Sequence, residues 1–415
     1  CSDSAGQMAF YTNGISIRNR NHNLMENGDT INPGILWNKY KTQSYTGEKL
    51  PMAVPAPGYH NHYYLIHLAT DFDGNFYYTT PLYYSLIDMN ANNGLGKVVK
   101  KNQVLMQPPA KRSLLVPVIT KHGNGRDWWI VTGLYDEPLQ YVFLVSPAGI
   151  SGPFVQQIGP PFPLAEGGAN NVFTPDGNVY VRTDARNGLR IYDFDRCTGQ
   201  LSNLRIVPYT KPFYTYRHAV SPNSQFLYGQ TSVEMAQFNL LAPDIGASLD
   251  TVAVHNGYVA PFPPFTTGFN LGSLGPDGNI YFATTGSTTA LHVIHSPNLP
   301  GLACDFQQHG IDLKKFNEGT MPRFPNYRLG PWQDSPCDTL HFQPPGGGFT
   351  PTPYAPPPPL RTDAGYRLLT PVPDKTQPPD IYFRRKKLPN PPQAQEWWWM
   401  NLEPKALNHD DAQHD

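Results

Sequence analysis

Two histidines, an arginine and an aspartate stand beside turns that recur along this chain. They are His122, Asp127, Arg217 and His218. Histidine is the usual general base near neutral pH. Repeats arranged about one axis would bring their equivalent loops together, so residues far apart in sequence could share one site. Because equivalent positions in the other repeats hold unrelated residues, structural hydrogen bonding is the competing interpretation.

Carboxylates are plentiful, but their spacing does not select a catalytic pair. Glycoside hydrolysis needs two carboxylates about 5–9.5 Å apart. The candidates are Asp88, Glu166, Asp184, Asp193 and Asp195. The repeats explain Asp193 and Asp195 as turn residues at strand ends. The nucleotide-binding glycine loops and the Gly-x-Ser-x-Gly elbow do not occur in the sequence, so we assign no catalytic residue.

One segment imitates a metal-binding loop. Asp71-Phe-Asp-Gly-Asn75 begins like a calcium loop, but the twelfth ligand position falls on Leu82. The same Asp-Gly pair recurs at Asp176-Gly177 and Asp277-Gly278, which favours a hairpin turn. Calcium is therefore the one cofactor left open, and we assign no metal ligand. His60-Asn-His62 is interpreted as a loop that leads into a strand.

Tryptophans suggest two binding surfaces. Trp128 and Trp129 alternate on one expected strand, so one ring should face the core and the other a neighbouring sheet or solvent. Core packing competes here with a sugar-stacking platform. The triplet Trp397, Trp398 and Trp399 lies near the end of the chain and could bury itself on a partner. The basic run Arg384–Lys387 is interpreted as a solvated tail, and no nucleic-acid binding is predicted.

The four cysteines give one expected bridge. Cys304 and Cys337 bracket a turn-rich segment and should form a disulfide in an oxidising compartment, whereas Cys197 is expected to be unpaired. No Cys-x-x-Cys spacing supports a zinc site. Cys1 already lies inside a repeat phrase, which suggests that an N-terminal piece is missing. Lipid anchoring at Cys1 is the alternative.

Recurrent turn-and-strand phrases are expected to position all of these residues. Phe173-Thr-Pro-Asp-Gly-Asn-Val-Tyr180 recurs as Gly275–Ala283 and as Ser221–Tyr228, with looser copies from Asp71, from His122 and from Asp3. Asp-Gly and Asn-Gly pairs accept the positive φ of hairpin turns. Steps of roughly 50 residues between short strands indicate a β-propeller with one four-stranded blade per repeat. We predict an all-β fold of seven blades, with six as the alternative.

Composition sets the domain organisation. The chain has 415 residues, 13% of them aromatic, and a net charge of −1, which gives no electrostatic case for nucleic acid or anionic lipid. Apolar runs such as 113–119 are far shorter than the ~20 residues of a membrane helix. We place the propeller at residues 1–342 and a Pro-rich extended tail at 343–415, docked on the propeller or on a partner.

The phrases together resemble the secreted, WD40-like β-propeller modules of Bacteroidetes that are associated with type IX secretion and gliding. The resemblance extends from Ser2 to about Leu340. The phrases that carry it are Ser2–Gly14, Asn21-His22, Met25–Gly28, Gln43-Ser44, Val54–Gly58, Tyr84–Asn90, Gly94–Gly96, Lys121–Gly125, Ser221–Tyr228 and Pro325–Thr339. The family's immunoglobulin-like sorting domain is not recognisable after residue 340, which puts type IX export in doubt.

The resemblance implies a secreted or cell-surface propeller, of a family that is usually without an assigned activity. We therefore predict a binding or scaffold propeller for a protein or glycan, with assembly through the tail as a further expectation. The alternative is a carbohydrate-active hydrolase or lyase, or a lactonase-like enzyme, that uses the channel of the propeller.

Overall fold

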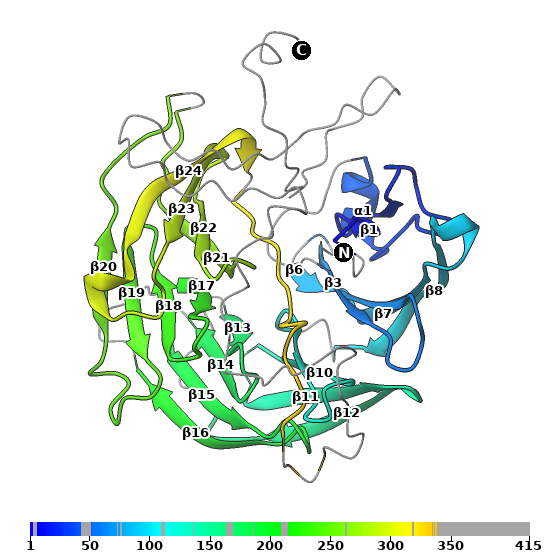
Figure 1. Ribbon diagram of the computed structural model, residues 1–415, viewed down its shortest axis with the longest axis horizontal. Helices are drawn as coiled ribbons and strands as arrows, with labels where there is room; N and C mark the ends of the chain where they lie inside the picture. The colour runs from blue at the N-terminus through cyan, green and yellow to red at the C-terminus, as the bar shows by residue number, and fades with distance from the viewer. Residues whose placement is uncertain are drawn as a thin grey trace.

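The computed structural model describes residues 1–2, 6–42, 51–72, 74, 77–108, 113–135, 137–162, 169–184, 186–208, 215–261, 264–317, 319–333, 335 and 337. Within these ranges, five four-stranded antiparallel sheets are arranged around a common centre as the blades of a β-propeller (Figure 1). The predicted all-β propeller is confirmed, but the predicted seven blades are wrong. The tail 343–415, with Trp397, Trp398 and Trp399, lies outside the described residues.

Each blade runs in chain order from the centre to the rim. Blade 1 comprises β3 (Met52–Pro55), β4 (His62–His67), β7 (Leu82–Asp88) and β8 (Lys97–Met106). Blade 2 comprises β9 (Val118–Lys121), β10 (Trp128–Gly133), β11 (Leu139–Ser146) and β12 (Gly149–Gln157). Blade 3 comprises β13 (Ala169–Phe173), β14 (Val179–Asp184), β15 (Gly188–Phe194) and β16 (Leu201–Val207). Blade 4 comprises β17 (Thr215–Val220), β18 (Phe226–Gln230), β19 (Glu234–Asn239) and β20 (Asp250–Val254). Blade 5 comprises β21 (Phe269–Leu274), β22 (Ile280–Thr284), β23 (Thr288–Ile294) and β24 (Phe306–Asn317).

A two-stranded sheet, β1 (Phe10–Thr12) with β2 (Ile17–Asn19), stands beside blade 1. Its Phe10 and Ile17 pack in one apolar cluster with Leu65 and Ile87 of blade 1. The sheet therefore covers the face of blade 1 that has no four-stranded neighbour. It corresponds to the first repeat phrase of the sequence, which supplies a hairpin here and not a full sixth blade.

The second repeat phrase also differs from the prediction. Asp71 lies in β5 (Thr70–Phe72), which pairs with β6 (Tyr77–Thr79) in a hairpin inserted between β4 and β7. The carboxylate of Asp71 accepts hydrogen bonds from the backbone N–H groups of Ile35 (3.0 Å) and Leu36 (2.8 Å) at the start of α1 (Ile35–Tyr40). This carboxylate thus caps a helix, and its neighbours Asp73 and Asn75 lie outside the described residues.

The core consists of apolar layers between adjacent blades, because successive side chains of a strand point to opposite faces. Trp128 lies in the layer between blades 1 and 2, and Trp129 in the layer between blades 2 and 3. They are only 1% and 3% exposed. Neither ring offers a free face on which a sugar could stack, so core packing is the interpretation that fits both.

The first turns of blades 2, 3 and 4 pack against the next blade. The turn 174–178 and the turn 275–279 place Gly177 and Gly278 at φ of 74° and 89°, as the Asp-Gly pairs predicted. Gly123 in the first turn of blade 2 donates its N–H to the carbonyl of Arg196, in the last turn of blade 3 (2.8 Å). Asn223 of blade 4 likewise donates its N–H to Asn298 of blade 5 (3.0 Å). The recurrent turns are therefore contacts between blades.

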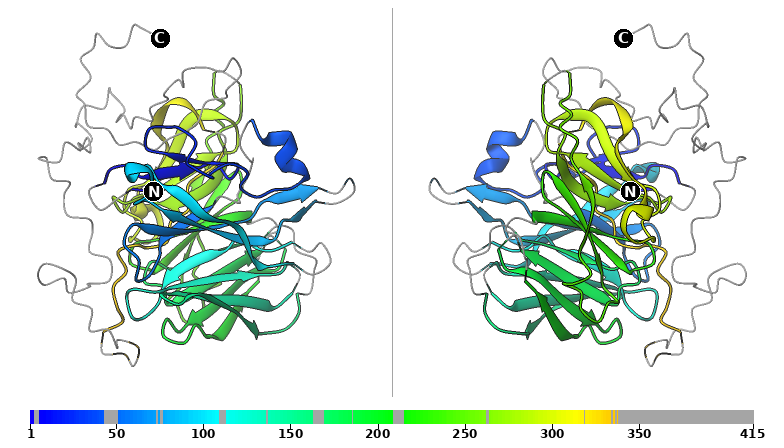
Figure 2. Two further views of the ribbon diagram at one scale, coloured as in Figure 1. Left: turned by 90° about the vertical axis from the view of Figure 1, so that its right-hand side faces the viewer. Right: turned by 90° about the vertical axis from the view of Figure 1, so that its left-hand side faces the viewer.

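After β24 the chain crosses one face of the ring as a segment that we call the strap, residues 319–333 with 335 and 337. Figure 2 shows the strap (amber) on one face of the propeller and α1 on the opposite face. None of the helices in the described part of the chain has the length and apolar character needed to cross a membrane.

Candidate functional site

The strap is the feature that distinguishes one face of this propeller. It begins along blade 5, where the Ser273 hydroxyl donates to the carbonyl of Pro322 (2.9 Å). It then contacts blade 3 through Asn326, whose amide donates to the carbonyl of Pro175 (2.8 Å). Tyr327 reaches blade 1, where its hydroxyl donates to the carbonyl of Ala53 (2.6 Å). One short segment therefore contacts blades 5, 3 and 1.

Arg196 anchors the far end of the strap. Its guanidinium donates to the carbonyls of Lys121 (2.9 Å) in blade 2 and Gly330 (2.7 Å) in the strap. The residue is 4% exposed, and burial lowers its pKa to about 10. These bonds are accepted by backbone carbonyls and not by a carboxylate. Arg196 therefore holds blade 2, blade 3 and the strap together.

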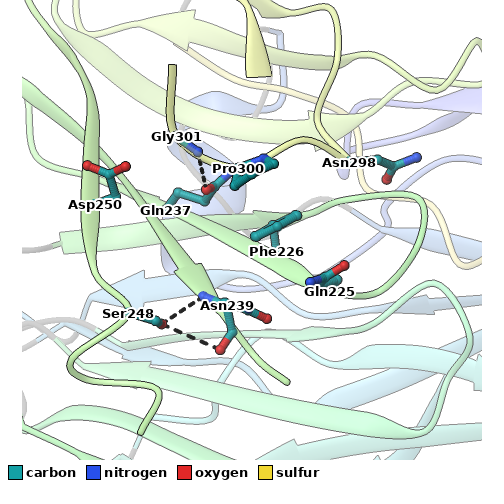
Figure 3. Close-up of a pocket in the computed structure, with 9 residues that line it drawn as sticks. All are labelled: Gln225, Phe226, Gln237, Asn239, Ser248, Asp250, Asn298, Pro300 and Gly301. Carbon is teal, nitrogen blue, oxygen red and sulfur yellow. Dashed lines mark hydrogen bonds between the residues drawn. The ribbon is translucent and has the colours of Figure 1, made fainter. Parts of the chain in front are cut away.

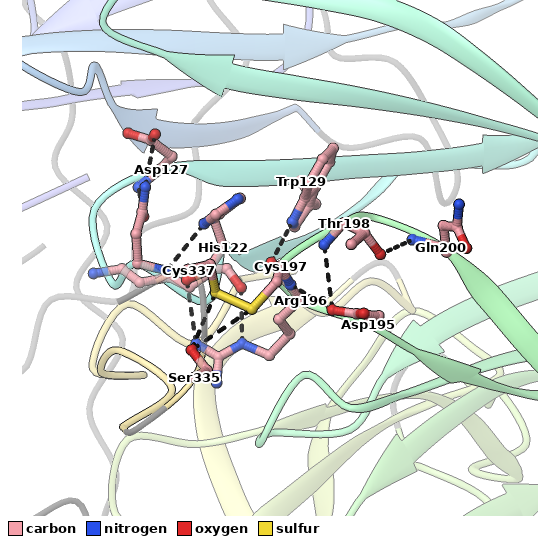
Figure 4. Close-up of a disulfide and its surroundings, with 12 residues drawn as sticks. His122, Asp127, Trp129, Asp195, Arg196, Cys197, Thr198, Gln200, Ser335 and Cys337 are labelled. Atoms are coloured by element: carbon pink, nitrogen blue, oxygen red, sulfur yellow. Dashed lines mark hydrogen bonds between the residues drawn. A yellow bond between two sulfur atoms is a disulfide. The ribbon is translucent and has the colours of Figure 1, made fainter. Parts of the chain in front are cut away.

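A disulfide completes the anchor (Figure 4). It joins Cys197, in the turn between β15 and β16, to Cys337 at the end of the strap. The predicted bridge between Cys304 and Cys337 is therefore wrong, and so is the prediction that Cys197 is unpaired. Cys304 is a buried free thiol at the end of a short helix, η3 (Gly301–Cys304), and packs with apolar side chains of blades 4 and 5.

The predicted residues of blade 2 lie beneath this anchor. His122 stacks on Trp129, with ring centroids 5.4 Å apart, and its Nδ1 accepts the N–H of Asn124 (2.9 Å). Asp127 accepts bonds from Asn124 (2.9 Å) and from Arg126 (2.7 Å). Burial lowers the pKa of His122, so the neutral imidazole is favoured. These contacts stabilise the turn 122–127.

Trp128 supports the strap from below. Tyr327 meets its ring edge to face at 5.9 Å, and the ammonium of Lys121 lies 4.8 Å from the same ring. Burial lowers the pKa of Lys121 to about 8, and the nearby charge of Arg196 acts in the same direction. Trp128 thus contacts the strap through the ring of Tyr327.

His218 does not belong to this group. It lies on β17, the innermost strand of blade 4, and is 7% exposed. Among the described residues, neither ring nitrogen has a hydrogen-bond partner, and burial lowers the pKa of His218 to about 3. The side chain of its neighbour Arg217 lies outside the described residues. The repeats suggested that His122 and His218 could share one site. None of the contacts described here joins these two side chains.

The carboxylates considered for hydrolysis have structural partners. Asp193 forms an ion pair with Arg205, and the carboxylate of Asp195 accepts the N–H groups of Cys197 (2.7 Å) and Thr198 (3.2 Å). Asp195 is thus the turn residue that the repeats predicted, and Glu166 lies outside the described residues. Across the described ranges, no group of three His, Cys, Asp or Glu side chains could hold a metal ion.

Exposed aromatic side chains follow the strap. Phe324, Tyr327 and Trp332 are 54%, 39% and 42% exposed, whereas the backbone N–H of Trp332 is held by the carbonyl of Gly123 (2.7 Å). Rings of this kind, on a backbone fixed at both ends, are what protein interfaces favour. Sequence reasoning missed them, although Tyr327 and Trp332 fall within the family phrase Pro325–Thr339.

A pocket lies between blades 4 and 5 (Figure 3). This pocket of about 360 Å³ is lined by Gln225, Phe226, Gln237, Asn239, Ser248, Asp250, Asn298, Pro300 and Gly301. Asp250 is its one ionisable side chain. The pocket therefore lacks the paired titratable groups of an acid–base catalyst.

Comparisons with known proteins add no function. No protein-family model and no curated protein matches the sequence. Among solved structures, the chain is similar to the Dos1 propeller, with 13% identity, a TM-score of 0.41 and coverage of 76% of this chain and 70% of that one. It is also similar to the Cps50 (Swd1) β-propeller domain of Myceliophteria thermophila, with 11% identity, a TM-score of 0.38 and coverage of 68% of this chain and 78% of that one. A periplasmic gluconolactonase of Pseudomonas aeruginosa is similar with 13% identity, a TM-score of 0.39 and coverage of 72% of this chain and 94% of that one.

These identities and TM-scores are low, so the five sheets themselves carry the assignment. The chain is a β-propeller with five four-stranded blades in its described part. The disulfide is consistent with an extracellular location, because such bonds persist in oxidising compartments.

Proposed function

We propose that this protein is an extracellular, non-enzymatic binding propeller that engages a protein or glycan partner through the strap face. The observation that carries the proposal is the strap itself. A segment fixed by a disulfide and by Arg196 presents three partly exposed aromatic rings, Phe324, Tyr327 and Trp332. Pre-ordering such rings lowers the conformational entropy that a partner must otherwise remove on binding.

A protein is the partner that we favour for this face. The strap contacts blades 5, 3 and 1 in turn. A surface that extends over several blades suits a protein footprint, which buries about 800 Å² on each side, better than a single sugar. Secretion, and membership of the Bacteroidetes family associated with type IX secretion and gliding, are parts of the same proposal and rest on the sequence phrases.

The test is capture of partners by the immobilised full chain, from surface proteins and on a glycan array. Phe324→Ser and Trp332→Ser should each reduce capture at least fivefold, because exposed aromatic anchors dominate interface energies. Phe154→Ser is the matched control, since Phe154 is 49% exposed on β12, at the rim of blade 2. Equal capture by the strap variants and the control would overturn the proposal.

An enzymatic role is the alternative and needs its own measurement. The wild-type chain should show no hydrolysis of lactones or of polysaccharides above the uncatalysed rate. Turnover that survives in Phe324→Ser and Trp332→Ser, and that saturates with substrate, would favour the lactonase-like or carbohydrate-active alternative instead.

A further inference from the structure

The pocket between blades 4 and 5 has a floor and a ring of polar groups. Figure 3 shows Phe226 and Pro300 at its centre, with Asp250 on one side and Asn298 on the other. Phe226 is 4% exposed and belongs to the core between the two blades, so the floor is fixed by the fold. The loop that follows β23 supplies the wall from blade 5.

Some of the polar side chains are fully used by the fold. The amide of Gln237 donates to the hydroxyl of Tyr228 (2.7 Å) and to the carbonyl of Leu299 (2.9 Å), and its oxygen accepts the N–H of Gly301 (2.9 Å). The hydroxyl of Ser248 donates to the carbonyl of Ile245 (2.7 Å). These two side chains shape the wall and have little left to offer a ligand.

Within the described part of the chain, two other amides are held through their oxygen atoms. Asn223 donates its backbone N–H to Oδ1 of Asn298 (3.0 Å) and its side-chain amide to Oε1 of Gln225 (3.3 Å). The orientation of each amide follows, because an N–H donor faces its oxygen. The NH₂ groups of Gln225 and Asn298 therefore remain as donors at the pocket.

Asp250 supplies the complementary acceptor. It is an exposed residue at the start of β20, and its carboxylate lines the same pocket as the two amides. A carboxylate accepts from several donors, and an amide NH₂ donates twice. The pocket thus offers donors and an acceptor around an apolar floor.

This set of groups matches a ligand with several hydroxyls and one apolar face. A hydroxyl group donates and accepts at once, so neighbouring hydroxyls can bond Asp250 on one side and the amides of Gln225 or Asn298 on the other. The lining contains no cationic side chain to hold a phosphate or a carboxylate. One carboxylate is also too few for calcium, which takes six to eight oxygen ligands.

We propose that this pocket binds a single neutral pyranose unit of a glycan, with its C–H face on the exposed ring of Pro300. About 360 Å³ lies at the lower end of the range for small-molecule pockets, roughly 300–1,000 Å³. The site is formed by blades 4 and 5 and goes beyond the proposed function, which rests on the strap.

The experiment is saturation-transfer NMR of the full chain with methyl pyranosides of glucose, galactose, mannose and N-acetylglucosamine, followed by a glycan array. At least one neutral pyranoside should bind. Asp250→Asn removes the carboxylate charge at constant shape. Asn298→Asp removes the NH₂ donors but keeps an oxygen for the N–H of Asn223. Each substitution should weaken binding about tenfold or more, because hydrogen bonds that involve a charged group are the stronger ones.

The control is Asp312→Asn, which changes an exposed aspartate on β24, outside the pocket, and should leave binding unchanged. Phe324→Ser should also leave pyranoside binding unchanged, which separates this site from the strap. The inference is overturned if neither the pyranosides nor the array shows binding, or if binding persists in both Asp250→Asn and Asn298→Asp. Competition by calcium or by inorganic phosphate at the same site would likewise overturn it.

Discussion

Cys197 and Cys337 are separated by 140 positions in the sequence, yet their Cα atoms lie 5.4 Å apart and their sulfurs are bonded. The bond joins a turn of blade 3 to a segment that has just left blade 5. It therefore closes a covalent loop around blades 4 and 5. The strap face owes its fixed shape to this closure and to the buried guanidinium of Arg196 beside it.

Removing the disulfide should lower stability substantially. A cross-link that closes a loop this long restricts the unfolded chain, and we expect Cys337→Ser to lower the free energy of unfolding by about 3–5 kcal/mol. Urea unfolding of the oxidised protein and of the variant measures the change. Cys1→Ser, which replaces an exposed free cysteine, should have no such effect. Peptide mapping that found Cys304 bonded to Cys337 would contradict the connectivity.

Arg196→Lys should loosen the strap without unfolding the ring. A single ammonium cannot replace the planar guanidinium that spans the carbonyls of Lys121 and Gly330, so we expect a loss of about 1–3 kcal/mol. Hydrogen exchange should quicken at the N–H of Trp332. Arg205→Lys is the matched control, since its ion pair with Asp193 is partly exposed and should contribute less than about 1 kcal/mol.

Local signals in the sequence predicted the turns, and non-local contacts explain what was missed. An Asp-Gly pair encodes positive φ wherever it stands, so Gly177 and Gly278 were placed correctly. The same local signal at Gly74 launches the hairpin of β5 and β6, which is inserted in blade 1 between β4 and β7. The phrase from Asp3 supplies only the sheet of β1 and β2, so the six phrases correspond to five blades. The sequence carries no mark that distinguishes the two uses.

The cysteine pairing was missed for a similar reason. Cys304 and Cys337 are consecutive cysteines in the sequence, but the strap places Cys337 beside Cys197 on the other side of the ring. The contacts of Arg196 with Gly330 depend on the same path. The anchored face therefore emerges from the tertiary structure, whereas two of its aromatic residues, Tyr327 and Trp332, were already present within a recognisable phrase.

Gly123 should be required for formation of the disulfide. A Cβ at this position would meet Sγ of Cys337 and would lie 3.0 Å from Sγ of Cys197. We expect Gly123→Ala to leave a large fraction of these two thiols reduced, because the sulfurs have no room beside the added methyl. Alkylation under denaturing conditions should count two free thiols in the wild type and up to four in the variant.

The control for that experiment is Gly246→Ala. The added Cβ would lie 3.3 Å from its nearest neighbours, Asp244 and Val207, and no cysteine is among them. It should retain two free thiols. A fully oxidised Gly123→Ala protein would show that the turn 122–127 can shift, against the packing described here.

Acid should destabilise the protein through buried histidines. Burial lowers the pKa values of His67 and His218 to about 3, whereas both titrate near 6.5 in the unfolded chain. The unfolded state alone gains protons as the pH falls below 6.5. Stability is therefore complete above pH 6.5 and is lost progressively toward pH 3, by about 2 kcal/mol for each residue at pH 5.

His218→Leu tests this account, because His218 forms no hydrogen bond within the described part of the chain that the substitution would remove. Urea unfolding between pH 4.5 and pH 8 should show an unchanged or higher stability at pH 8 and a shallower decline in acid. His60→Ala, at an exposed position, should leave the decline as it is. An unchanged slope in His218→Leu would mean that His218 accepts a proton in the folded state.

Phe10→Ala should expose the open side of blade 1. Phe10 is 1% exposed and meets the ring of Tyr63 edge to face at 5.4 Å. Truncation of a buried phenylalanine costs about 3–5 kcal/mol, and here the loss should be confined to β1, β2 and blade 1, because blades 2 to 5 have their own apolar layers. Hydrogen exchange that quickens in β4 but not in β18 would confirm this. Ile35→Ala, 57% exposed on α1, should change stability by less than about 0.5 kcal/mol. A uniform loss of protection in all five blades would mean that the short sheet is part of one cooperative ring, and not a separate cover for blade 1.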